Sequence, residues 1–378
     1  GLILGGAITQ NNFLGTGNRV SFGLTRSEYQ SNYNFGFVDP YWTMDGVSLG
    51  YNVFYNKTDY DDADYDITSY SVDTLGAGVS IGYPISETSS LNYGLTASQD
   101  SLSSGTYTVP SILEFMANNG GDYTEADFTN VKASIGWGES TLNRGILPNR
   151  GYSQSVTLQT TVPAASDLEF YKLDYRGQHF TPLSKQTALR LHTELGYGDG
   201  FGDTDGLPFY ENYFAGGISS VRGFRNGSLG PRAVASLAFP NISSNPNQLP
   251  NYDPVTGIYQ CNPATGICTD PDQDDQPFGG NVMITGGVDY LFPLPFIKDQ
   301  SSLRTTFFVD VGNVFSTNCD DFQVDCNSPD LGDLAVSTGF GLTWITAMGP
   351  LGFAIATPIK EPDNSDPQFF QFTLGQTF

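Results

Sequence analysis

Hydrophobic and polar residues alternate with a period of two along most of the chain. In residues 334–344 the large apolar side chains fall at even positions, while alanine, serine, glycine and threonine occupy the odd positions. Residues 281–292, 302–315 and 368–378 repeat this alternation of a large apolar face with a small or polar face. A period of two is typical of β-strands that turn one face toward an apolar environment. The pattern therefore predicts an all-β protein.

About fifteen segments with this pattern can be counted in the sequence. They lie near residues 2–9, 18–26, 29–38, 47–56, 69–83, 89–100, 127–139, 152–162, 168–178, 186–197, 281–292, 302–315, 334–345, 350–357 and 368–378.

The connections between these segments alternate in length. Short turns, such as 84–89 and 181–185, alternate with longer acidic connections, of which the one at about 198–280 is by far the longest. A soluble β-sandwich would show a similar alternation within its strands. Many strands in one meander, with short turns on one side and long loops on the other, favour a transmembrane antiparallel β-barrel whose short turns face the periplasm. We expect one such domain over residues 1–378, with an extracellular loop at about 198–280.

The orientation of the first turn bears on the number of strands. If the turn at 10–17 is periplasmic, the strand before it runs inward from the outer side of the membrane. Bacterial single-chain barrels usually have an even number of strands. We therefore expect sixteen strands in the intact barrel, with the first strand preceding residue 1.

The composition fits a barrel and excludes several other classes. The chain is 39% hydrophobic and 13% aromatic and contains 44 glycines, without the uninterrupted apolar run of about 18 residues that a membrane helix needs. Its formal net charge of −24 argues against nucleic-acid binding. The acidic clusters lie in loops, where solvation is their usual role, and we expect neither a metal nor a cofactor.

Four cysteines form two closely spaced pairs in loop sequence, Cys261 with Cys268 and Cys319 with Cys326. Neither histidine is near a cysteine, which disfavours a zinc site. Two short-range disulfides in an oxidising compartment are the better interpretation.

A four-residue motif, Val221, Arg222, Gly223 and Phe224, lies within the long connection. An arginine folded into a barrel must find carboxylates or remain solvated. The alternation places Asp289 and Asp310 on the inward faces of two successive strands, together with Phe308, whose ring can stack on a guanidinium. We expect Arg222 to contact Asp310, with Asp289 nearby. A charge pair that only stabilises the barrel is the alternative interpretation.

These residues carry a resemblance to the BamA family of outer-membrane assembly proteins. The segment from Phe209 to Gly217 that leads into the motif resembles the sixth extracellular loop of that family. Further similar stretches are 12–17, 40–42, 45–50, 348–351 and 370–378. The resemblance begins at the family's second strand, and the chain includes no upstream POTRA domains.

The resemblance implies a function and a location. It implies an integral protein of the bacterial outer membrane that inserts and folds β-barrel proteins there. It also implies three kinds of partner: lipids and lipopolysaccharide, unfolded outer-membrane proteins, and Bam lipoproteins bound through upstream POTRA domains. A weak seam between the first and last strands would open sideways and pair with the incoming strand. The implied gate residues in the last strand are Phe370, Phe372, Leu374, Gly375 and Phe378.

Three other functions remain open at this point. TamA-like and two-partner secretion barrels such as FhaC share the loop motif, so the upstream domains would have to separate them. A passive porin lacks the motif. A barrel enzyme needs a histidine beside a nucleophile or carboxylate at an accessible rim. Neither His179 nor His192 has such a place, so we expect no catalytic residues.

Overall fold

A computed structural model describes most of the 378-residue chain. The described residues are 4–27, 30–59, 70–105, 108–233, 260–261, 268–269, 275–294, 297, 302–319, 323–324, 326, 329–346, 349–363 and 365–374.

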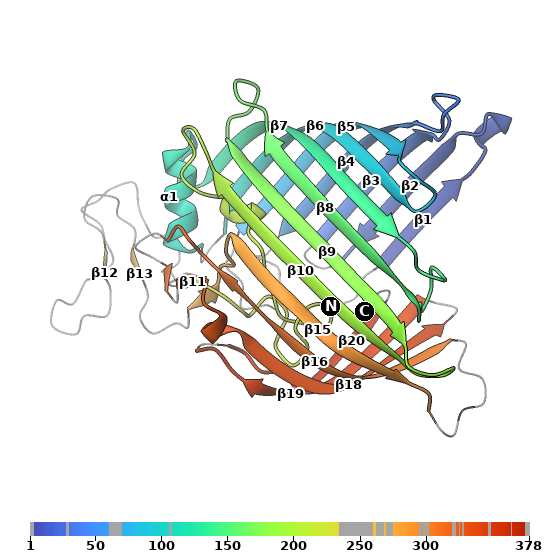
Figure 1. The fold of residues 1–378 in the computed structure, drawn as a ribbon. Helices are drawn as coiled ribbons and strands as arrows, with labels where there is room; N and C mark the ends of the chain where they lie inside the picture. Colours follow the sequence, from blue (N-terminus) through green and yellow to red (C-terminus); the bar gives the residue numbers. More distant parts are fainter. Residues whose placement is uncertain are drawn as a thin grey trace.

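Within the described residues, fifteen strands form one sheet in which each strand pairs antiparallel with its neighbours in the chain order β1 to β10, β15, β16, β18, β19 and β20. Figure 1 shows these strands inclined and wrapped around a common interior, as in a barrel. Their bounds are β1 Leu4–Gln10, β2 Arg19–Arg26, β3 Gln30–Asp39, β4 Ser48–Asp59, β5 Tyr70–Pro84, β6 Ser89–Ser104, β7 Glu125–Ser140, β8 Gly151–Thr161, β9 Phe170–Pro182, β10 Ala188–Gly200, β15 Val282–Phe292, β16 Leu303–Phe315, β18 Ala335–Thr346, β19 Gly349–Lys360 and β20 Phe370–Leu374.

The two faces of the strands have the chemistry that the alternation predicted. On β18, Phe340 and Trp344 are exposed on the outer face, while Ala335 and Ser337 are buried on the inner face. On β16, Phe307 is exposed and Asp310 is fully buried. An apolar outer face with a small or polar inner face is the arrangement of a barrel in a membrane.

Most of the smaller elements lie at one end of the barrel, while η1 lies in the turn between β1 and β2 at the other end. The helix α1 (Pro110–Asn118) connects β6 to β7, and Pro110 stands in its first turn, where a missing backbone N–H costs nothing. A three-stranded sheet joins β14 (Gln276–Pro277), β11 (Arg232–Ala233) and β17 (Gln323–Val324), while β12 (Gln260–Cys261) pairs with β13 (Cys268–Thr269). Short 3-10 helices are η1 (Phe13–Gly15), η2 (Phe209–Glu211) and η4 (Leu331–Asp333).

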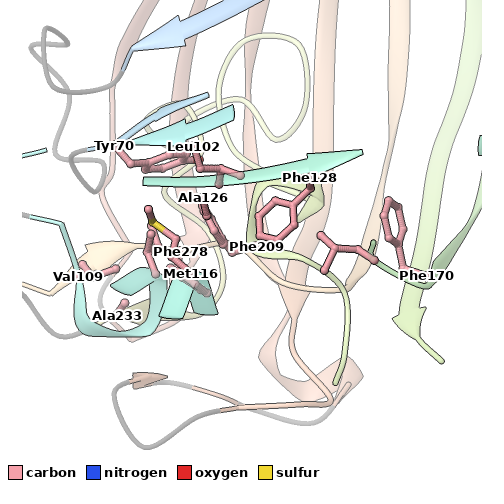
Figure 2. Close-up of a cluster of buried hydrophobic side chains, with 12 residues drawn as sticks. Tyr70, Leu102, Val109, Met116, Ala126, Phe128, Phe170, Phe209, Ala233 and Phe278 are labelled. Atoms are coloured by element: carbon pink, nitrogen blue, oxygen red, sulfur yellow. The ribbon is translucent and has the colours of Figure 1, made fainter. Parts of the chain in front are cut away.

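A cluster of buried apolar side chains holds this end together (Figure 2). Met116 of α1, Phe128 of β7, Phe170 of β9 and two loop residues, Phe209 and Phe278, belong to it. The ring centroids of Phe209 and Phe278 lie 6.3 Å apart. The described residues of the connection after β10 that belong to this cluster, Phe209, Ala233 and Phe278, are thus packed against α1 and the strand ends.

The sheet has two free edges in the described part of the chain. β20 pairs with β19 from Leu351↔Leu374 to Ile355↔Phe370, and no pairing of β20 with β1 occurs among the described residues. None of the helices described is long and apolar enough to cross a membrane.

Comparison with the sequence predictions confirms the all-β antiparallel fold and all fifteen segments, with ends that differ by a few residues. The helix α1 and the small loop sheets were not predicted. The sixteenth strand stays a prediction.

Candidate functional site

The motif Val221–Phe224 lies deep inside the barrel. Val221 and Phe224 are fully buried, and Arg222 retains only 3% of its exposure. The backbone around the motif is bent back on itself, because the Gly217 N–H donates to the Phe224 carbonyl at 2.9 Å. The glycines of this loop allow that bend: Gly216, Gly217 and Gly223 all have positive φ angles, which other residues rarely adopt.

Arg222 is bound by two carboxylates at once. Its Nε and Nη2 atoms donate to the two oxygens of Asp310, each at 2.7 Å, and Nη2 also donates to Asp289 Oδ1 at 2.6 Å. The backbone N–H of Arg222 adds a bond to Asp310 at 3.1 Å. The guanidinium carbon lies 3.6 Å from the centroid of the Phe308 ring. Two-point binding with ring stacking is a geometry that arginine allows and lysine does not.

The charges around Arg222 are balanced within the cluster. Asp289 also accepts a bond from Arg190 Nη1 at 3.1 Å. Nε2 of His192 lies 3.8 Å from Asp289 and 3.7 Å from Asp310. Burial alone would lower the pKa of Arg222, but Asp310 and then Asp289 outweigh burial and raise this pKa above its ordinary value. Arg222 is therefore a fixed positive charge.

The same cluster has the composition of a weak metal site. His192, Asp289 and Asp310 offer ligand atoms within 4.8 Å of one another. The Arg222 guanidinium already lies against both carboxylates, and it supplies the positive charge that a cation would bring. We interpret the cluster as the binding site of the arginine.

Gly223 seats the motif on the barrel wall. Its Ser337 and Ala356 neighbours belong to β18 and β19, and a Cβ atom added to Gly223 would lie 3.2 Å and 3.1 Å from their Cβ atoms. Ser337 Oγ donates to the carbonyl of Arg222. The absence of a side chain at Gly223 thus allows the motif to lie directly against the strands that precede β20.

The motif is also bonded to β20 and to the segment before it. Gln371, the buried residue of β20, donates from Nε2 to the Phe224 carbonyl at 2.7 Å, and its Oε1 accepts from the Gly223 N–H at 3.1 Å. The Gln368 N–H donates to the Gly223 carbonyl at 2.8 Å. Before the strand, the Asp366 carbonyl accepts from the Arg225 N–H at 2.7 Å. We call these four hydrogen bonds the latch.

A second ionic contact holds the loop before the motif, at Glu211. Glu211 accepts from Lys132 of β7 at 2.5 Å and from Lys172 of β9 at 3.1 Å. The Lys172 ammonium also lies 4.6 Å from the ring centroid of Tyr213. Burial would raise the pKa of Glu211, but the charges of Lys132 and Lys172 outweigh burial and hold this pKa below its ordinary value.

The structure brings Arg222 of the loop together with Asp289, Phe308 and Asp310, the three residues that strand alternation placed on the inner surface. It adds contacts that the sequence did not reveal, above all Gln371 and the pair of lysines on Glu211. The polar residue Gln371 between Phe370 and Phe372 was the available signal for the latch.

The remaining predicted site residues fall into two groups. Cys319 and Cys326 form a disulfide, as expected. Cys261 and Cys268 are backbone partners across β12 and β13, but their side chains lie outside the described residues, so that disulfide stays a prediction. Of the proposed gate residues, Phe370, Phe372 and Leu374 are exposed on the outer face of β20. Gly375 and Phe378 lie outside the described residues.

Comparison with known proteins identifies the family. A model of the Omp85 superfamily domain matches residues 12–378. The chain belongs to the Omp85 superfamily. It is similar to the outer membrane protein assembly factor BamA of Neisseria meningitidis, with 30% identity over 100% of this chain and 45% of that protein. The corresponding protein of Nitratidesulfovibrio vulgaris is 21% identical over 99% of this chain and 39% of its own length. This Omp85 chain thus spans less than half the length of these curated relatives.

Among solved structures, a BamA structure is more similar to this chain than two CdiB structures are. The crystal structure of Haemophilus ducreyi BamA lacking POTRA domains 1–3 matches this Omp85 barrel with a TM-score of 0.80 and 30% identity, over 100% of this chain and 68% of that chain. CdiB from Acinetobacter baumannii and CdiB from Escherichia coli match with TM-scores of 0.55 and 0.52 at 13% identity, over 98% of this chain and 56% and 58% of theirs. The CdiB matches show the fold alone. The resemblance to BamA is confirmed, and the chain is an integral protein of the bacterial outer membrane.

Proposed function

We propose that this chain is the membrane domain of an outer-membrane protein assembly factor, which inserts and folds other β-barrel proteins in the outer membrane. The observation that carries the proposal is the likeness to BamA over the whole chain in sequence and in fold. Its substrates are unfolded outer-membrane proteins. Lipids and lipopolysaccharide surround the barrel, and Bam lipoproteins act through POTRA domains upstream in the full-length protein.

The proposed mechanism is a lateral gate at the free edge of β20. An unpaired strand edge within a membrane is costly, because the hydrocarbon offers no partner for backbone N–H and C=O groups. Such an edge therefore pairs readily with another strand. β20 has five residues paired with β19, and Phe370 and Phe372 face outward. In the proposed mechanism the first and last strands separate, and the incoming chain adds its strands at this edge.

The latch gives the motif a part in this mechanism. Arg222 is fixed on β15 and β16 through Asp289 and Asp310, while Gly223 and Phe224 are bonded to Gln371 of β20. In the proposed gate the motif holds the inner face of β20 against the barrel wall formed by β18 and β19. The edge of β20 that does not pair with β19 remains free to pair with a substrate strand.

A pair of engineered disulfides tests the gate in the full-length protein. One disulfide joins the first strand of the barrel to β20. The matched control joins β19 to β20 at Phe353 and Phe372, which are already partners in the sheet. We expect the gate disulfide to abolish assembly of outer-membrane proteins in cells until a reductant is added, while the barrel stays folded and the control stays active. If the locked protein still sustains assembly, the barrel is a scaffold or an export channel.

A further inference from the structure

A basic cavity opens at the end of the barrel opposite α1. It has a volume of about 510 Å³ and lies between the turn 141–150, the start of β10 and the ends of β15 and β16 that meet there. Arg144, Lys185 and Arg304 line it. The cavity lies at the side of the short turns, which is the periplasmic side of an outer-membrane barrel.

The charge of this cavity departs from that of the chain. The protein has 40 acidic and 16 basic residues. Nevertheless, no aspartate or glutamate is among the described residues that line the cavity. Within the described parts of the chain, none of its three cationic side chains has a carboxylate within ion-pair distance. Three cationic side chains around one cavity favour an anionic ligand.

The cavity is a built feature of the fold. Arg304 extends from β16 to the carbonyl of Pro148 in the turn and so holds the turn over the opening. Leu142 of the same turn packs on the buried cluster of Phe180, Ala188 and Leu291. Leu147 has a φ angle of +48°, a conformation that costs energy for a leucine and persists only where the surrounding structure imposes it.

The walls select among anionic ligands. Leu147, Leu291 and Leu294 face the cavity, so an inorganic anion would leave these apolar surfaces without a partner. Arg304 and Leu291 have the same strand parity as the buried Asp310 and Asp289, so they lie on the inner surface. The outer face carries the exposed Phe307 and Val309. A polypeptide entering from the periplasm reaches this inner surface more directly than a lipid outside the wall.

We infer that this cavity binds an acidic stretch of polypeptide that also carries apolar side chains and approaches from the periplasm. The carboxylates contact Arg144, Lys185 and Arg304, while the apolar side chains lie against the leucines. The inference rests on the outer-membrane location of the barrel and on its short turns, and it does not require the insertion activity. A binding assay does not measure insertion, so the two proposals can fail separately.

Fluorescence anisotropy on the full-length protein in detergent micelles tests the site. The probe is a short labelled peptide in which glutamate and leucine alternate, and the control peptide has lysine in place of glutamate. The variant is Arg144→Glu combined with Lys185→Glu, because both side chains are exposed and neither holds the turn. The matched variant is Arg150→Glu, an exposed residue of the same turn that does not line the cavity.

We expect the acidic peptide to bind and the lysine peptide to bind far less. The double variant should bind about tenfold more weakly, and added salt should weaken the wild-type complex, since exposed charges are screened. Arg150→Glu should bind as the wild type does. Equal binding by the double variant would overturn the inference. Displacement of the peptide by inorganic phosphate at a similar concentration would also overturn it. So would binding of phosphatidylglycerol vesicles at this site without binding of the acidic peptide.

Discussion

Arg222 shows why the motif requires an arginine. Its guanidinium reaches both oxygens of Asp310, one oxygen of Asp289 and the face of Phe308. An ammonium group is a point charge and cannot make the planar two-point contact or stack in this way. The two carboxylates are buried among strands. Asp310 depends on the cation that Arg222 brings, while Asp289 also has Arg190 as a partner.

Replacing Arg222 should therefore destabilise the barrel. Arg222→Glu is expected to lower the free energy of unfolding by about 3–5 kcal/mol, because the buried Asp310 loses its bound guanidinium and Asp289 is left with Arg190. Arg222→Lys should lose less, since it keeps the charge. The control is Arg176→Glu, whose side chain is 72% exposed in the barrel interior. Urea unfolding in lipid vesicles, followed by tryptophan fluorescence, measures the difference. An unchanged urea midpoint for Arg222→Glu contradicts the prediction.

Gly223 allows a separate test of how closely the motif lies against the wall. Gly223→Ala introduces a Cβ at 3.1 Å from Ala356 and 3.2 Å from Ser337, at a φ angle of +93°. Gly227 has a φ of +69°, but its added Cβ would meet Phe214 only at 3.6 Å.

Both alanine variants should lose about 1–2 kcal/mol of stability from the backbone conformation. The additional loss expected for Gly223→Ala therefore reports the contact with β18 and β19. Thermal unfolding of the two variants side by side measures it. Equal melting temperatures would mean that the motif lies farther from the wall than the structure shows.

Among the elements, the long loop after β10 is the one that the sequence describes least well. The strands were predictable because their alternation is local and each can be recognised alone. The loop is fixed by distant partners: Lys132 and Glu211 are 79 residues apart in the chain. Glycines with positive φ and single polar residues position it, and neither produces a periodic pattern. The Arg222 cluster could be anticipated because its two aspartates lie on predictable strands.

The Glu211 contact predicts a pH dependence for the loop. The pKa of Glu211 in the folded protein lies below its ordinary value of about 4.3. Its contribution to the stability of the loop is therefore complete above that ordinary value. The contribution is lost as the pH falls through the lower, folded pKa.

Glu211→Gln should therefore destabilise the loop at pH 7 by about 1–3 kcal/mol, through the loss of charge-assisted bonds to Lys132 and Lys172. The difference between wild type and variant should disappear in acid, below the folded pKa. Limited proteolysis of the loop at a series of pH values measures this difference. A gap that persists unchanged in acid would show that the carboxylate charge is not what holds the loop.

At the scale of the whole molecule, the segment Val221–Phe224 links β15 to β20, the last strand of the fifteen-stranded sheet. The motif is fixed to β15 and β16 by charge, seated on β18 and β19 by Gly223, and bonded to β20 by Gln371. One short segment thus touches every strand from β15 to the free edge. Among the described residues β20 has five that pair with β19, so the four hydrogen bonds of the latch add substantially to what holds this part of the strand.

Gln371→Met should loosen β20 selectively. Methionine has a similar length but cannot bond the Phe224 carbonyl or the Gly223 N–H, and leaving these buried groups unpaired costs about 1–3 kcal/mol. Amide hydrogen exchange should accelerate in β20 and stay unchanged between β16 and β18, whose pairing does not involve Gln371. Gln178→Met, a half-buried residue on β9, is the control and should leave β20 unaffected. If β20 exchanges at the wild-type rate in Gln371→Met, the final strand is held by its neighbour β19 alone, and the motif does not restrain the gate.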